Sequence, residues 1–147
     1  MFISEFVSHL RPLQKKISDD IFHYGEFPAS VYFIVKGRVH FVIGPKKTVY
    51  KTMTTGSYFG EIELIAKIPR TTETKAGTNL DLLTISKQNF EQIMLEYPEY
   101  AQEIHQIAKK RNHLMKQSIK KIKRLIPISK DSTFWFKQRN ESLRELI

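Results

Sequence analysis

The residues from Gly56 to Thr72 read GSYFGEIELIAKIPRTT, and this stretch decides the expected fold and site. It holds two glycines, a short apolar turn that starts at a Gly-Glu pair, and an arginine nine residues after that glutamate. Gly60 lets the backbone come close to a ligand, because a side chain there would collide with it. Residues 61–65 can form a short helix whose first free N–H groups point at an anion. The combination suits a phosphate that also carries a sugar.

Two charged residues of this stretch are expected to bind different parts of such a ligand. Arg70 can bind a phosphate through a forked pair of charge-assisted hydrogen bonds, which a lysine cannot imitate. Glu61 would repel a phosphate that faced it, so its expected partner is an uncharged donor such as a ribose hydroxyl. From the same turn we also expect Ile62, Glu63 and Leu64 to contact the ligand.

These residues resemble the phosphate-binding cassette of the cyclic nucleotide-binding domain, in the form found in hyperpolarisation-activated and cyclic nucleotide-gated ion channels. The resemblance covers roughly residues 2–120. Its further motifs occur in the order and spacing of those channels: Leu10-Arg11, Asp20-Ile21, Tyr32-Phe33-Ile34, Lys36-Gly37, Asn89-Phe90 and Glu96-Tyr97-Pro98.

The resemblance implies roles for the cassette residues. In the family, the arginine that matches Arg70 pairs with the cyclic phosphate, and the glutamate that matches Glu61 bonds the ribose 2′-hydroxyl. In channel-type members, the threonine that matches Thr71 helps to hold a guanine in the syn orientation, which permits cGMP without excluding cAMP. An ordinary strand position is the alternative for Thr71. Thr72 departs from the family pattern, because a small alanine is common there.

The rest of the site is expected from strand positions around Val49 and Met53 and from a long C-terminal helix. Arg111 interrupts the apolar stripe of that helix. The resemblance implies that Arg111 lies over the purine as a lid, with Leu114 and Met115 as apolar neighbours. An ordinary place in the core is the alternative for each apolar position.

The expected fold class is α+β: an antiparallel, jelly-roll-like β-roll flanked by helices, with a long C-terminal lid helix. Short β-rich runs separated by glycine turns favour such a roll. The expected strands are 21–24, 31–35, 38–43, 48–53, 71–75 and 80–86, and the expected helices are 2–10, 87–96 after an N-cap at Ser86, and 99–125.

The domain is expected over residues 1–126, with the roll at about 17–86 and the lid helix at about 99–126. The remaining tail, 127–147, carries the aromatic residues Phe134, Trp135 and Phe136 on an expected short helix. Packing back onto the domain is the first interpretation of this cluster, and covering the base or docking to another subunit are the others. Met1 begins inside the first expected helix, so we expect a longer parent protein.

Composition argues against several functional classes. The chain has 147 residues and no cysteine, which excludes a disulfide framework and a thiol-metal site. No apolar run approaches the roughly 18–20 residues of a membrane span. The histidines show no metal-ligand spacing, and no catalytic triad or carboxylate pair stands out. We therefore expect no enzymatic activity, no metal and no cofactor, with cAMP or cGMP as the ligand.

Positive charge is concentrated in the lid helix. The net charge is +9, and residues 101–126 hold eight Lys or Arg against one acid, Glu103. A solvated helix face is the first interpretation, and contact with an acidic partner or a membrane surface is the second. Nucleic acid is not expected as a partner, because this run lacks a second recognition helix and stacking aromatics.

The sequence thus predicts a cytoplasmic sensor domain that moves its C-terminal helix on nucleotide binding and gates a membrane channel. Its expected partners are the nucleotide, the pore and linker of a parent channel, and neighbouring subunits of a tetramer. The main alternative is the regulatory module of a protein kinase or another stand-alone receptor. A transcription factor would need a winged helix-turn-helix that the tail cannot supply. A degenerate homologue without ligand is the remaining alternative, against which Glu61 and Arg70 together argue.

Overall fold

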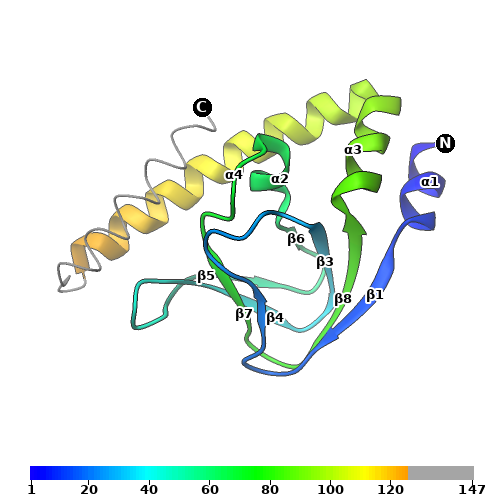
Figure 1. The fold of residues 1–147 in the computed structure, drawn as a ribbon. Coiled ribbons are helices and arrows are strands. Elements are labelled where there is room, and N and C mark those ends of the chain that lie inside the picture. The colour runs from blue at the N-terminus through cyan, green and yellow to red at the C-terminus, as the bar shows by residue number, and fades with distance from the viewer. Residues whose placement is uncertain (126–147) are drawn as a thin grey trace.

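The computed structural model describes residues 1–125, in which two antiparallel sheets form a roll and helices gather at one end of it (Figure 1). The strand orders of the two four-stranded sheets are β1-β8-β3-β6 and β2-β7-β4-β5. The elements in chain order are α1 (Phe2–Ser8), β1 (Arg11–Lys15), β2 (Asp20–Phe22), β3 (Ser30–Lys36), β4 (Arg38–Ile43), β5 (Thr48–Thr54), β6 (Tyr58–Phe59), α2 (Glu61–Ala66), β7 (Glu73–Ala76), β8 (Leu80–Ser86), α3 (Lys87–Glu96) and α4 (Pro98–Leu125).

This architecture confirms the predicted α+β roll with a long C-terminal helix. Strands β4 and β8 have the predicted bounds, whereas β1 and β6 were not predicted. Strand β1 contains Pro12, which lacks a backbone N–H, and β6 has only two residues. Strand β1 lies at the edge of its sheet and pairs with β8 alone, where a proline is tolerated. The sheets therefore begin before residue 17.

The predicted strand 71–75 was wrong at its start, because β7 begins only at Glu73. The backbone N–H of Thr71 donates to the Glu63 carboxylate at 3.2 Å and not to a neighbouring strand. Thr71 therefore belongs to the cassette rather than to the ladder.

The core has two parts on opposite sides of the sheet that holds β3 and β8. The first fills the roll, and α4 covers it with Met115 and Ile119, which are 3% and 0% exposed. The second packs Phe90 and Ile93 of α3 against Val31 and other residues outside the roll. Apolar burial on both sides anchors the strands that carry the cassette.

The helices begin where the chain offers a start signal. The Oγ atom of Ser86 accepts a hydrogen bond from the backbone N–H of Asn89 at 3.2 Å, so the predicted N-cap of α3 is confirmed. Helix α4 starts at Pro98, whose fixed φ suits a first helical position. It contacts α2, α3 and β5 and runs across the end of the roll (Figure 1).

Within residues 1–125, no helix combines the length and the apolar character that a membrane crossing requires. The predicted tail helix and its aromatic cluster lie outside the described residues.

Candidate functional site

The cassette turn connects β6 to α2 and lies beneath α4. Gly60 has φ +88°, a left-handed conformation that favours glycine. A Cβ atom added there would lie 3.3 Å from Nη1 of Arg70, so a larger residue would also crowd this guanidinium. The short helix predicted after Gly60 is present as α2. The sequence of the turn therefore brings the backbone next to Arg70.

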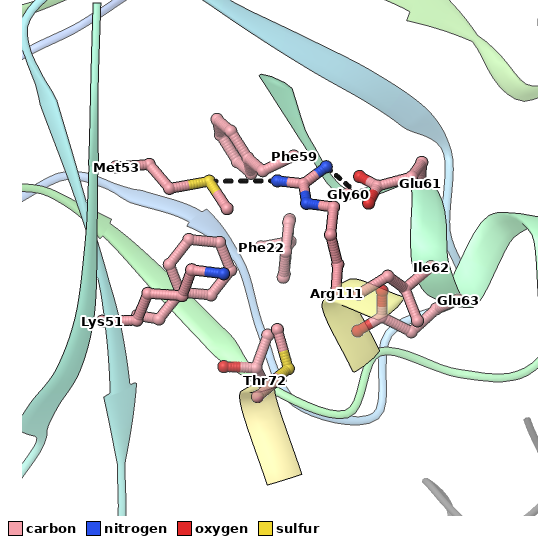
Figure 2. Close-up of a pocket in the computed structure, with 12 residues that line it drawn as sticks. Phe22, Lys51, Met53, Phe59, Gly60, Glu61, Ile62, Glu63, Thr72 and Arg111 are labelled. Carbon is pink, nitrogen blue, oxygen red and sulfur yellow. Dashed lines mark hydrogen bonds and ion pairs between the residues drawn. The ribbon is translucent and has the colours of Figure 1, made fainter. Parts of the chain in front are cut away.

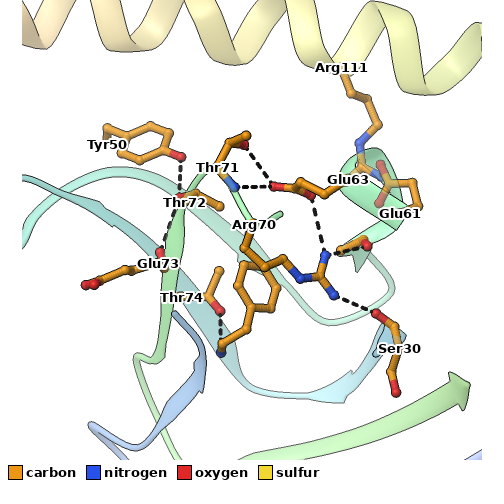
Figure 3. Close-up of polar contacts among 12 residues, drawn as sticks. Ser30, Tyr50, Glu61, Glu63, Arg70, Thr71, Thr72, Glu73, Thr74 and Arg111 are labelled. Atoms are coloured by element: carbon orange, nitrogen blue, oxygen red, sulfur yellow. Dashed lines mark hydrogen bonds and ion pairs between the residues drawn. The ribbon is translucent and has the colours of Figure 1, made fainter. Parts of the chain in front are cut away.

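The guanidinium of Arg70 is buried and connects three parts of the roll (Figure 3). Nη1 donates to the carbonyl oxygen of Gly60 at 2.6 Å, and Nη2 donates to the carbonyl oxygen of Ser30 at 2.8 Å. The Cζ atom lies 4.0 Å from the centre of the Phe22 ring. Nη1 also lies 3.4 Å from Oε2 of Glu63. Arg70 thus lies next to Gly60, but its charge already has a carboxylate partner.

Glu63 uses both carboxylate oxygens inside the cassette (Figure 3). Oε1 accepts hydrogen bonds from the backbone N–H of Thr71 at 3.2 Å and from its Oγ1 at 2.9 Å. Oε2 faces Arg70, and the Glu63 side chain is only 4% exposed. The sequence predicted Glu63 at the ligand, and the structure places its carboxylate on the arginine predicted to bind the phosphate.

A second Arg–Glu pair joins the cassette to the long helix (Figure 2). Nη1 of Arg111 on α4 lies 2.7 Å from Oε1 of Glu61. Nη2 of Arg111 donates to the carbonyl oxygen of Tyr58 at 2.5 Å, and its Cζ lies 4.4 Å from the centre of the Tyr58 ring. Arg111 therefore reaches from the helix to the glutamate expected to bind ribose.

Glu61 keeps one oxygen without a partner. Within the described part of the chain, its buried Oε2 finds no hydrogen-bond donor. Burial raises the pKa of the Glu61 carboxyl, and the nearby Arg111 guanidinium opposes this rise. Buried acceptors are normally paired, so Oε2 is suited to receive a donor from a ligand.

The cavity enclosed by these residues is small, about 10 Å³, which is close to the space of one water molecule. Arg111 enters it from α4, and Phe22 and Phe59 lie beside the Arg111 side chain (Figure 2). The lining residues are Phe22, Phe41, Lys51, Met53, Phe59, Gly60, Glu61, Ile62, Glu63, Thr72, Arg111 and Met115. The structure thus brings the cassette turn and α4, the two parts of the predicted site, together around one small cavity.

Five residues predicted at the ligand do not line the cavity. Two of them, Arg70 and Thr71, are buried around the Glu63 carboxylate, and the other three lie elsewhere. Val49 is 43% exposed, because a register shift in the β4–β5 pairing leaves Tyr50 as an extra residue and turns Val49 away. Leu114 is 55% exposed, since it lies one helical step, about 100°, from the buried Met115. Leu64 is buried in the outer part of the core with α3.

The sequence analysis also missed lining residues, of which Lys51 bears most on the chemistry. Its side chain points into the cavity from β5 (Figure 2). Burial and the neighbouring Arg111 lower the pKa of its ammonium group. Lys51 lies two residues before Met53, so strand alternation places both on one face. That alternation was the available signal for Lys51.

A model of the cyclic nucleotide-binding domain family matches residues 14–97, more than half of the chain. The chain belongs to this family. Cyclic nucleotide-binding domains of channels and regulatory subunits are non-catalytic ligand sensors, in agreement with the predicted lack of enzymatic activity.

Channel proteins are among the similar curated proteins. The chain is 28% identical to potassium/sodium hyperpolarization-activated cyclic nucleotide-gated channel 1 of Homo sapiens, over 99% of this chain and 16% of the channel. It is 34% identical to channel 4 of the same group from Rattus norvegicus, over 66% of this chain and 8% of the channel. It is 27% identical to a putative potassium channel protein of Rhodopseudomonas palustris, over 74% of this chain and 27% of that protein.

This cyclic nucleotide-binding domain therefore spans only a small part of each channel that it matches. Among solved structures, cAMP-bound PfPKA-R is similar with a TM-score of 0.67 and 20% identity, over 80% of this chain and 38% of that one. At this identity the likeness shows the fold alone.

Proposed function

We propose that this domain binds cAMP or cGMP and couples binding to the position of α4, which in a parent protein gates an ion channel. The observation that carries the proposal is the ion pair between Arg111 on α4 and Glu61 in the cassette, 2.7 Å long. A ligand that donates a hydrogen bond to Glu61 shares this carboxylate with Arg111. Ligand binding and helix position are therefore linked through one pair of side chains.

The residues around the cavity fit the parts of a cyclic nucleotide. The unpartnered Oε2 of Glu61 can accept a hydrogen bond from a ribose hydroxyl. Met53, Phe59 and Met115 supply apolar surface for a purine. Arg70 does not line the cavity but donates to the carbonyl oxygen of Gly60, which does, and the family resemblance puts the phosphate at Arg70. The set therefore provides a contact for the sugar, the base and the anion.

The size of the cavity requires movement. A volume of about 10 Å³ cannot hold a nucleotide, so Arg111 and the part of α4 that carries it must shift when the ligand enters. A ligand moves such an equilibrium by the difference in its affinity for the two positions. Contacts with the base after entry would draw Arg111 back as a lid. The helix movement is the proposed output.

The similar channels favour a channel as the parent protein. The alternative, a kinase regulatory module, is supported only by likeness of fold to PfPKA-R. In a channel the domain would lie on the cytoplasmic side next to the pore linker and neighbouring subunits. The exposed lysines of α4, such as Lys109 and Lys120, would then face solvent or an acidic partner.

The test is a calorimetric titration of this chain with cAMP and with cGMP, combined with hydrogen exchange along α4. We expect micromolar affinity, about −8 kcal/mol, for at least one nucleotide, and changed exchange in α4 on saturation. Glu61→Ala should weaken binding roughly tenfold or more, about 1.4 kcal/mol. Glu103→Gln, an exposed change on α4, should leave affinity as it is.

Two results would contradict the proposal. If neither nucleotide binds, the sensor function is wrong. If a nucleotide binds but the exchange of α4 stays the same, the domain binds ligand without the proposed output. The ratio of the two affinities identifies the messenger.

A further inference from the structure

A carboxylate of the protein itself, that of Glu63, already contacts Arg70, the arginine of the cassette. Oε2 of Glu63 lies 3.4 Å from Nη1 of Arg70, and the two side chains are 4% and 1% exposed. The other oxygen, Oε1, takes the N–H and the hydroxyl of Thr71 at 3.2 and 2.9 Å. Figure 3 shows the Glu63 carboxylate between Arg70 and Thr71. The contact is therefore a built arrangement with three donors, not a chance surface pair.

A carboxylate and a cyclic phosphodiester present similar chemistry to such a site. Each carries one negative charge shared by two oxygens that are free to accept hydrogen bonds. A guanidinium together with a backbone N–H and a hydroxyl can serve either anion. The Glu63 carboxylate therefore accepts from the same donors that are expected to bind the phosphate of the nucleotide.

Both anions cannot use these donors at once. Two like charges in one buried site repel each other strongly, because the local dielectric constant is low. Arg70 has no spare donor facing water, since its side chain is 1% exposed and its other bonds go to the carbonyls of Gly60 and Ser30. A phosphate that approaches Arg70 must first displace the Glu63 carboxylate.

We propose that Glu63 is a built-in anion of the cassette, which holds the phosphate-binding groups in the absence of ligand and sets nucleotide affinity by competing with the phosphate. The inference rests on the proposed nucleotide binding. In the ligand-free domain, the carboxylate compensates a buried arginine that would otherwise have no counter-charge. On binding, the phosphate replaces it on Arg70 and Thr71. Glu63 is thus an affinity-determining residue of this chain.

The experiment compares calorimetric titrations of the unchanged chain, Glu63→Gln, Glu63→Ala and the control Glu103→Gln, each with cAMP and with cGMP. Glutamine keeps the size of the side chain but removes the negative charge that binds Arg70. We expect at least roughly tenfold tighter nucleotide binding in both Glu63 variants. The control also removes one negative charge, from the exposed face of α4, and should bind like the unchanged chain.

The direction of the change separates competition from a structural role. A residue that only supports the fold would lower affinity when replaced, whereas a competitor raises it. If the unchanged chain binds and both Glu63 variants bind equally or more weakly, this inference is wrong and the sensor function stands. If none of the four proteins binds either nucleotide, the sensor function is wrong, and the inference with it.

A second measurement needs no variant and covers the case in which replacement of Glu63 unfolds the domain. Saturation of the unchanged chain with its nucleotide should move the amide resonance of Thr71, because this N–H exchanges a carboxylate for a phosphate. An unmoved Thr71 amide in the saturated domain would show that Glu63 keeps its place, and would overturn the inference.

Discussion

Two Arg–Glu pairs, whose glutamates both lie on α2, have different surroundings. Arg70 and Glu63 both belong to the roll and its turn, and their side chains are 1% and 4% exposed. Arg111 and Glu61 join α4 to the roll, and their side chains are 17% and 2% exposed. The first pair joins two residues within the cassette, and the second joins α4 to the cassette. The chemistry is the same, but only the second pair connects elements that can move apart.

The difference in burial also separates the energies of the two pairs. Removing one partner of a fully buried pair leaves a charge without water, which costs far more than the pair contributes as a whole. Arg111 is close enough to solvent to be hydrated when its partner is lost. We therefore expect the first pair to control stability and the second to control the position of α4.

The largest effect on stability is expected for Arg70→Ala. It should lower the free energy of unfolding by about 3–5 kcal/mol, because Glu63 is left buried without its counter-charge. Nucleotide binding should be lost as well. Urea unfolding measures the stability, and Arg38→Ala, an exposed arginine on β4, is the control. Adding Glu63→Ala to Arg70→Ala should recover part of the loss, and a double variant that is less stable than Arg70→Ala would contradict this account.

A smaller effect is expected for Arg111→Gln. The loss of its bonds to Glu61 and Tyr58 should lower the free energy of unfolding by about 1.5–3 kcal/mol, the range for hydrogen bonds with charged groups. The effect is smaller than for Arg70→Ala, because the glutamine amide can still donate to the buried Glu61 carboxylate. Hydrogen exchange in α4 should become faster while exchange in the sheets stays the same. Lys110→Gln removes the same charge from an exposed neighbour and should change neither. Equal effects of the two variants would show that the Arg111 contact does not hold the helix.

The smallest effect is expected for a pair outside the cassette. Nζ of Lys75 lies 2.9 Å from Oδ1 of Asp20, and both side chains are about one-third or more exposed, 31% and 41%. Asp20→Asn should cost only about 0.2–1 kcal/mol at neutral pH, because water screens the pair. This variant provides the exposed reference against which the two cassette pairs are compared.

The pH dependence of this reference pair has a defined sign. The hydrogen bond from Lys75 lowers the pKa of Asp20 below its ordinary value of 3.8. The pair therefore stabilises the fold above that value, and its contribution is lost as the pH falls through the lower pKa of the folded state. Urea unfolding of the two proteins should converge at low pH. A difference that grew with acidity would contradict the sign.

Some elements could be predicted because their signals are local. Ser86 before an amphipathic run indicated the start of α3, and glycine turns divided the strands. Strand β1 was missed because Pro12 and exposed polar residues hide a short edge strand. Val49 was placed on the wrong side because the extra residue at Tyr50 reverses the alternation of β5. A bulge depends on the partner strand and leaves no mark in the local pattern.

Residue order alone was enough for the roll, the cassette turn at Gly60 and the long helix, because these follow from glycine conformation, apolar periodicity and a family motif. It also predicted Arg70, Glu61, Glu63 and Arg111 as charged residues of the site, and it missed Lys51. It did not indicate how they pair. Arg111 meets Glu61 across 50 positions of sequence, and Glu63 turns inward to Arg70 and Thr71. Pairing among several charges depends on distances between folded elements and on which of them lose contact with water, and neither quantity exists until the chain has packed.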